Sequence, residues 1–223
     1  MTVVRRLPGP VRRGLGRLIR WSRAASADLA IVGPPDAFAK GFKAFGRGSA
    51  LLSPQGVIYN ERYISLGEDT MIGPNVAITA GMAPTQEMVT DPVVSIGSRC
   101  IIGRGSHIVG HWSITIGDDI MTGPYVYITD QNHTYDDVEA PIGRQWPIEA
   151  AVTIGAGSWL GANCVILPGT TLGRNTVVAA GAVVSGEFPD RCVIGGVPAR
   201  VLRRWVDGQG WVRPSAVEPP TTT

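Results

Sequence analysis

The sequence predicts an all-β solenoid in which short strands stack in parallel around a triangular core. Three observations support this fold class. Aliphatic residues recur every six positions through much of the chain, glycine usually follows them, and the 29 glycines and 17 prolines contrast with only 7% aromatic residues. A six-residue period fits neither an α-helix, which repeats near 3.6 residues, nor a simple strand, which alternates every two. We therefore interpret each repeat as one short strand followed by a corner.

The aliphatic column can be followed through several blocks of the sequence. Its members are Leu66, Ile72, Ile78, Ile96, Ile102, Ile108, Ile116, Thr122, Ile128, Ile154, Leu160, Ile166, Leu172, Val178 and Val184. Three sides of six residues close a coil of roughly 18 residues, and a fixed repeat of this kind indicates a solenoid. Stacked coils pair their strands at about 4.8 Å and align the aliphatic side chains in the interior. We expect the glycines to supply backbone conformations that other residues disfavour at the corners.

Bulk properties exclude several classes of protein. A net charge of +2 is too balanced to indicate nucleic-acid binding, and no stretch approaches the roughly 20 apolar residues of a membrane span or the apolar segment of a signal peptide. Cys100, Cys164 and Cys192 match neither a disulfide framework nor zinc-ligand spacing. The first two fall at small positions of the repeat, so we expect buried core thiols. These features predict a cytoplasmic protein, and association with a membrane surface is an open alternative.

The repeat is interrupted each time after the third side of a coil. One interruption gives a loop at residues 80–93, a short one follows Ile108, and the longest gives a loop at residues 129–151. Insertions that leave at one corner gather on one edge of a solenoid, and such an edge is commonly the binding edge. We expect the two long loops to shape the functional site.

Over roughly Tyr59 to Arg204, the phased repeats resemble the hexapeptide-repeat acyltransferases. The resemblance implies a left-handed parallel β-helix, a handedness that runs against the usual crossover rule. It also implies an acetyl-CoA-dependent O-acetyltransferase of the sugar or xenobiotic kind, acting on a hydroxyl of a saccharide or another small acceptor. In that family the enzyme is a homotrimer with sites between neighbouring subunits, and no metal is expected.

Three regions follow from this pattern. Residues 1–48 are predicted to be a basic and helical N-terminal segment, in which Phe38, Phe42 and Phe45 lie at helical spacing and would cap the open end of the solenoid. Residues 49–198 would form the β-helix. Residues 199–223 would form a short C-terminal helix, from the sequence PARVLRRW, and a disordered tail rich in Gly, Pro and Thr.

The first 23 residues form a separate basic segment. No acidic residue precedes Asp28, and the arginines are Arg5, Arg6, Arg12, Arg13, Arg17, Arg20 and Arg23. Val11, Leu15, Leu18 and Trp21 would form an apolar stripe if this segment were helical. One interpretation is contact with a membrane surface through residues 1–23. The other is a helix packed on the β-helix or on a neighbouring subunit.

His133 is the candidate catalytic residue. It lies in YVYITDQNHTYDD, where a strand-like run breaks off into the longest loop. Transfer of an acyl group to a hydroxyl needs a base beside the acceptor, and neutral imidazole, with a pKa near 6.5, serves at neutral pH. In the resembling family a histidine at this place is the general base. Four carboxylates could orient the ring, and the sequence does not choose among Asp130, Asp136, Asp137 and Glu149.

The C-terminal repeats resemble the acetyl-CoA-binding run of the same family. The resemblance implies that the cofactor-binding residues are Trp159, Gly161, Ala162, Ala180, Ser185, Arg200 and Arg203. The first three would flank the thioester and the next two would lie along the pantetheine arm. The two arginines would bind the CoA phosphates, which suit guanidinium geometry. Gly161, Ala162 and Ala180 are also explained by core packing, and the arginines by a solvated helix face.

Two departures from the family pattern concern the donor and the acceptor. Gly186 replaces a lysine that is common in the sugar acetyltransferases, and Gly103 occurs where they have an asparagine. Fewer contacts to CoA would follow, and these departures support a saccharide acceptor less well than they support acyl transfer itself.

Two other functions remain open from the sequence. A non-catalytic scaffold could use the β-helix and the basic segment for association. A metal-dependent β-helix hydratase would need three histidine ligands, and the chain has three histidines, His107, His111 and His133, at a spacing that does not match that class.

Overall fold

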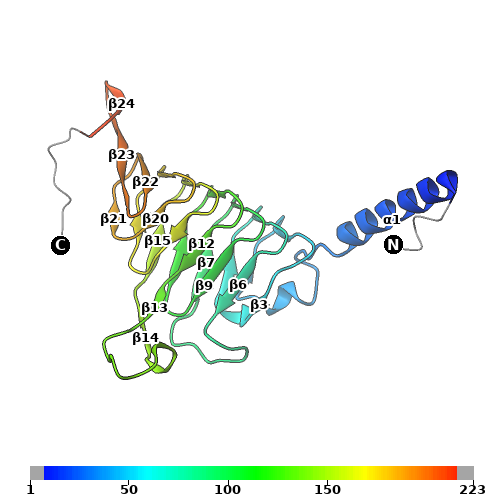
Figure 1. Ribbon diagram of the computed structural model, residues 1–223, viewed down its shortest axis with the longest axis horizontal. Coiled ribbons are helices and arrows are strands. Elements are labelled where there is room, and N and C mark those ends of the chain that lie inside the picture. Colours follow the sequence, from blue (N-terminus) through cyan, green and yellow to red (C-terminus); the bar gives the residue numbers. More distant parts are fainter. Residues whose placement is uncertain (1–7, 215–223) are drawn as a thin grey trace.

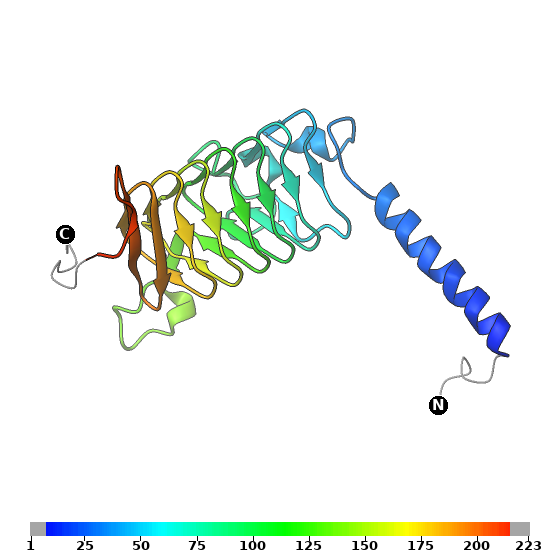
Figure 2. The same cartoon turned by 90° about the horizontal axis from the view of Figure 1, so that it is seen from above.

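The computed structural model describes residues 8–214, and three parallel sheets form the sides of a triangular prism (Figures 1 and 2). The first sheet contains β1 (Ala44–Phe45), β4 (Ile64–Leu66), β7 (Val94–Ile96), β10 (Ile114–Ile116), β15 (Val152–Ile154), β18 (Thr171–Leu172) and β21 (Glu187–Phe188). The second contains β2 (Ala50–Leu51), β5 (Met71–Ile72), β8 (Ile101–Ile102), β11 (Met121–Thr122), β16 (Trp159–Leu160), β19 (Val177–Val178), β22 (Cys192–Gly196), β23 (Ala199–Val206) and β24 (Gly210–Val212). The third contains β3 (Ile58–Tyr59), β6 (Ala77–Ala80), β9 (His107–Gly110), β12 (Tyr127–Thr129), β17 (Val165–Ile166) and β20 (Val183–Val184). The predicted left-handed parallel β-helix is confirmed.

The six-residue repeat corresponds to in-register columns inside the prism. In the third sheet Ile78 pairs with Ile108, Ile108 with Ile128, and Ile128 with Ile166. All four are at most 1% exposed. Stacking like residues in register buries an aliphatic side chain from each side of each coil, which is the main stabilising contribution to such a core. All three cysteines are buried free thiols, and burial raises the pKa of Cys164 to about 12.

The glycines after the aliphatic residues have a different role from the one expected. They lie outside the left-handed region, which is occupied at the corner between the first and second sheets by Asp69, Arg99 and Asp119, with φ of 52°, 57° and 58°. A Cβ at Gly103 would instead collide with the backbone of Gly123 in the next coil. Close stacking of successive corners therefore selects glycine at this position.

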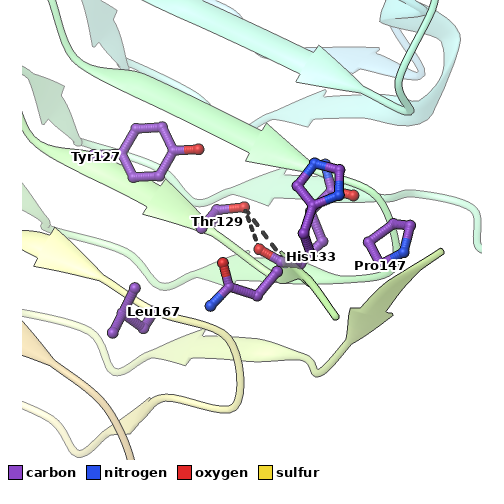
Figure 3. A pocket seen from close by; sticks show the side chains of 7 residues that line it. Tyr127, Thr129, His133, Pro147 and Leu167 are labelled. Atoms are coloured by element: carbon purple, nitrogen blue, oxygen red, sulfur yellow. Dashed lines mark hydrogen bonds between the residues drawn. The ribbon is translucent and has the colours of Figure 1, made fainter. Parts of the chain in front are cut away.

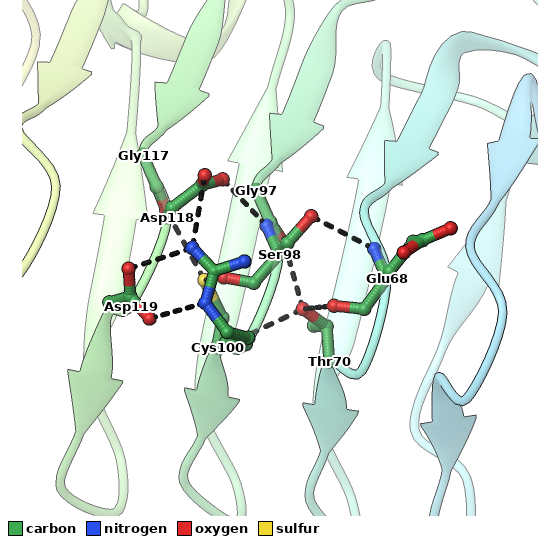
Figure 4. A network of polar contacts seen from close by, with 9 residues as sticks. Glu68, Thr70, Gly97, Ser98, Cys100, Gly117, Asp118 and Asp119 are labelled. Carbon is green, nitrogen blue, oxygen red and sulfur yellow. Dashed lines mark hydrogen bonds and ion pairs between the residues drawn. The ribbon is translucent and has the colours of Figure 1, made fainter.

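A polar ladder holds the corner between the first and second sheets (Figure 4). The backbone N–H of Ser98 donates to Asp118 at 2.8 Å, and the N–H of Glu68 donates to the Ser98 hydroxyl at 3.0 Å. The Arg99 guanidinium donates to Asp119 at 2.7 Å and holds the pKa of that carboxyl below its ordinary value. These bonds cross from coil to coil and satisfy backbone groups at a corner that carries no insertion.

The ends of the β-helix differ from the prediction. Its first coil begins at Ala44, before the predicted start at residue 49, and Phe45 belongs to β1. The expected helix around the phenylalanines is a single 3₁₀ turn, η2 (Ala39–Gly41). Phe42 packs edge-on against both Phe38 and Phe45, at centroid distances of 5.7 and 5.3 Å. The three rings cover the end of the core.

The predicted C-terminal helix is wrong. Residues Ala199–Val206 form β23, which pairs antiparallel with β22 through a two-residue turn at Val197 and Pro198. The pairing satisfies the open edge of the second sheet, which a helix would have left unpaired. β24 adds a further antiparallel strand, and residues 215–223, where the disordered tail was predicted, lie outside the described residues.

The predicted N-terminal helix is present as α1 (Gly9–Leu29), which projects from the first coil. None of its residues is buried, so it does not pack on the β-helix of its own chain. Among the described residues, no helix is long and apolar enough to cross a membrane.

Two adjacent isoleucines of β8 test how far the interior columns stabilise the protein. Ile102 is 1% exposed and Ile101 is 48% exposed. Replacing Ile102 with Ala removes buried methyl groups and leaves a cavity, so the free energy of unfolding should fall by about 2–5 kcal/mol in urea titrations. The matched change Ile101→Ala should cost less than about 1 kcal/mol. Equal losses for the two variants would contradict the column assignment.

Candidate active site

Three excursions leave the prism at the corner between the third and first sheets. They follow β6, β9 and β12, as the interruptions of the repeat predicted. The longest begins with β13 (Gln131–His133), continues through the 3₁₀ turn η4 (Ile142–Arg144) and returns as β14 (Pro147–Glu149). β13 and β14 pair antiparallel, with His133 opposite Pro147. The loop at residues 129–151 is therefore an ordered hairpin at its base.

Asp130 fastens this hairpin to the coil beneath it. Its buried carboxylate accepts hydrogen bonds from the backbone N–H groups of His111, Trp112 and Ser113 at 2.8, 2.8 and 2.7 Å. Burial raises the pKa of the Asp130 carboxyl, and these three bonds oppose the rise. Asp130 also accepts from the Ala150 N–H through its backbone carbonyl. Its role is to join two excursions, and it is occupied away from the His133 ring.

None of the four candidate carboxylates hydrogen-bonds the His133 ring within residues 8–214. Glu149 instead meets the Nδ1 atom of His111, and the carboxylate of Asp137 accepts from the Glu139 N–H at 3.0 Å. The His111 ring is buried, and its Nε2 atom lies 3.3 Å from the side-chain amide of Gln86. One histidine thus links the loop at residues 80–93 to the hairpin.

The cluster around His111 is the part of the site that the sequence did not reveal. The sequence indicated His111 only as a candidate metal ligand and gave no reason to select Gln86. Their contact joins positions 25 residues apart, which no local pattern predicts. The placement of His111 directly after β9, at the corner where the other loops leave, is the one feature that pointed to it.

His133 opens onto a pocket of about 190 Å³ on the outer surface of the third sheet (Figure 3). Its other lining residues are Tyr127, Thr129, Gln131, Asn132, Pro147 and Leu167. The side-chain oxygen of Gln131 is buried and has no hydrogen-bond partner among the described residues. An acceptor without a donor is costly to bury, so this oxygen is an unsatisfied polar group beside the pocket.

A second pocket of about 410 Å³ adjoins the first. The two share Asn132 and Leu167, and the second extends past Glu149 to Ser185. The structure therefore brings Ser185, one of the predicted CoA contacts, to the same edge as His133.

Four other predicted CoA contacts lie at a different corner, between the second and third sheets. Trp159 is on β16, Gly161 and Ala162 follow that strand, and Ala180 follows β19 in the next coil. A Cβ at Gly161 would lie 2.5 Å from the backbone nitrogen of Ala180. Close packing alone thus requires glycine here, and the same packing leaves a smooth surface along the coils.

The two predicted phosphate-binding arginines continue this surface. Trp159 pairs with Val177, Val177 with Val193, and Val193 with Arg203, so these residues form one column across four strands. Three strand spacings separate Trp159 from Arg203, which is about 14 Å. Arg200 is exposed on the same strand, β23. Both arginines are on a strand and not on the predicted helix, but their place beyond the last coil is unchanged.

The three histidines lie in different surroundings. His107 is exposed on β9, His111 is buried against Glu149, and His133 lines the pocket on the hairpin. In residues 8–214, no three side chains of His, Cys, Asp or Glu come together as a metal site.

Two family models match the repeat region of this chain. Residues 93–129 match the family model described as hexapeptide repeat of succinyl-transferase, and residues 151–186 match the bacterial transferase hexapeptide model. The chain is 31% identical over 155 residues to the putative lipopolysaccharide biosynthesis O-acetyl transferase WbbJ of Escherichia coli, a match that covers 66% of this chain and 75% of that protein. The chain belongs to the hexapeptide-repeat acyltransferases.

Two further similarities concern this family. The chain is 37% identical over 107 residues to the probable acetyltransferase Rv3034c of Mycobacterium tuberculosis, which covers 48% of this chain and spans 36% of that protein. It also resembles the hexapeptide-repeat acetyltransferase VCA0836 of Vibrio cholerae complexed with acetyl-CoA, with a TM-score of 0.52 and 27% identity over 76% of this chain and 74% of that chain. The family expected from the repeats is confirmed.

Replacing Asp130 with Asn tests the anchoring of the hairpin. An amide would put an NH₂ group against backbone N–H donors, so the free energy of unfolding should fall by about 1–3 kcal/mol in urea titrations. Asp136→Asn removes the same charge from an exposed position of the same loop and should stay within about 0.5 kcal/mol of the parent. An Asp130→Asn variant as stable as the parent would show that the three backbone bonds do not hold the loop.

Proposed function

We propose that this protein is an acetyl-CoA-dependent O-acetyltransferase in which His133 is the general base and a saccharide or another small hydroxyl compound is the acceptor. One observation carries the proposal: His133 opens onto a pocket beside the unpartnered Gln131 oxygen, and that pocket continues toward Ser185. A base and a pocket beside it for the acceptor are what acyl transfer to a hydroxyl requires on the acceptor side.

In the proposed reaction one proton moves through His133 while an oxygen–carbon bond forms and a carbon–sulfur bond breaks. The His133 imidazole takes the proton of the acceptor hydroxyl as its oxygen attacks the thioester carbonyl. The carbon–sulfur bond then breaks, and the imidazolium returns the proton to the departing CoA thiolate. Gln131 also lines the pocket, where we expect its side chain to help orient the acceptor toward the base.

The separation of the two halves of the site supports the further proposal that the protein is a homotrimer. Within one chain, His133 and the column from Trp159 to Arg203 lie at different corners of the prism. A threefold arrangement of such prisms, each presenting one corner to the next, would bring the base of one chain to the CoA surface of its neighbour. Arg200 and Arg203 would then bind the phosphates of CoA. The buried free thiols fit a reducing cytoplasm, where we place the reaction.

The general base is tested by removing His133. His133→Ala should lower kcat by about 10²–10⁴-fold in an assay of free CoA thiol release with saccharide acceptors. CoA binding in calorimetric titrations and the oligomeric state should not change, since the imidazole lies outside the proposed CoA contacts. Tyr135→Ala changes an exposed side chain of the same loop and should be close to the parent. Retained turnover in His133→Ala would refute the assignment.

Mixed oligomers test whether the site lies between chains. His133→Ala lacks the base, and Ala180→Trp fills the proposed donor surface at an exposed position, so each variant alone should be inactive. In randomly mixed trimers, one interface in four pairs an intact base with an intact donor surface, so coexpression should restore about a quarter of the parent activity. Recovery close to zero would place both halves in one chain, even if each single variant behaves as expected.

A further inference from the structure

Within residues 8–214, helix α1 (Gly9–Leu29) is a long element without a packing partner, since none of its residues is buried. It stands clear of the prism in both overall views (Figures 1 and 2). Its attachment is local: the Gln55 side chain donates to the Ala30 carbonyl at 2.5 Å, and Val32 forms an antiparallel bridge with Leu51. The helix is therefore held at its C-terminal end and exposed along its length.

The exposed helix has two chemically distinct faces. At 100° per residue the large apolar side chains fall within an arc of about 160°. They are Val11, Leu15, Leu18, Ile19, Trp21 and Leu29, all exposed, with Trp21 at 68%. The remaining arc contains the arginines of the helix, which are Arg12, Arg13, Arg17, Arg20 and Arg23. An apolar face opposite a face of arginines is typical of helices that lie in a membrane interface.

The charge of the helix selects among possible partners. No acidic residue precedes Asp28 in the sequence, so the arginine face has no carboxylate partner on its own helix before the last turn. Pairing with the same helix of a second copy would cover the apolar faces but leave both arginine faces without an opposite charge. A surface of anionic phosphates offers the opposite charge over the whole length of the helix.

We propose that α1 binds the surface of an anionic lipid bilayer. Its apolar face would lie at the boundary between headgroups and acyl chains, and its arginines would bind lipid phosphates. Trp21 lies at the border of the two faces, where an indole ring sits at headgroup level. Five arginines within the helix oppose insertion across the bilayer centre, because each is strongly disfavoured there. Binding would place the β-helix at the membrane, with the N-terminal coil toward the lipid.

Sedimentation with vesicles tests this proposal on the full-length protein. The parent should bind vesicles of phosphatidylcholine and phosphatidylglycerol at 7:3 and release them as salt is raised, and it should bind pure phosphatidylcholine at least tenfold more weakly. The triple change Arg12→Gln, Arg13→Gln and Arg17→Gln should weaken binding to the anionic vesicles by about 100-fold, since each arginine contributes about fivefold near such a surface. Equal removal of charge from the prism, through Arg47→Gln, Arg104→Gln and Arg174→Gln, should leave binding within about threefold of the parent.

The apolar face has its own variant and control. Leu18→Gln with Trp21→Gln should abolish sedimentation, whereas Ala24→Gln with Ala27→Gln puts the same side chains on the arginine side and should preserve it. Circular dichroism confirms that the fold is retained in each variant. Absence of parent binding to anionic vesicles would overturn the proposal. So would an oligomeric state that changes with the Leu18 and Trp21 variant in sedimentation velocity, because the apolar face would then be occupied by another copy of the chain.

Discussion

In-register stacking of short parallel strands is the constraint on which the rest of this molecule depends. A single coil cannot bury its own aliphatic side chains, so each coil is stable only between neighbours. Ile108, for example, lies between Ile78 and Ile128, with strand pairing above and below. Close glycine contacts keep two corners compact, and a polar ladder supports one of them. Within residues 8–214 the insertions therefore lie at the third corner, where they form the candidate active site.

That edge combines rigidity with an open surface. Asp130 joins the hairpin to the preceding coil through three backbone bonds, and His111 links the hairpin to the loop at residues 80–93. The hairpin then holds His133 beside the pocket. A side chain on a loop keeps a defined position only with such support. Asp130 and His111 thus hold the hairpin in place without lining the pocket beside His133.

The two ends of the prism are finished in different ways. At the C-terminal end, β23 and β24 pair with the last strand of the second sheet and cover its edge with antiparallel structure. At the N-terminal end, Phe42 and its aromatic neighbours close the core, and α1 continues outward. An open sheet edge invites association, and the antiparallel strands cover that edge of the second sheet at the C-terminal end. The helix leaves one end available for a different partner.

The sequence by itself determined the solenoid, its three sides, the corner that carries the loops and the place of His133. These follow from a periodic pattern, because each repeat states which residue points inward and where the period breaks. Only the tertiary structure decided the contacts among Gln86, His111, Glu149 and Asp130, since these residues are distant in sequence and no local pattern links them. The helix predicted for PARVLRRW was wrong for the same reason. The pairing partner of this segment, β22, is brought beside it only by the tertiary structure, and this pairing outweighs the local preference for a helix.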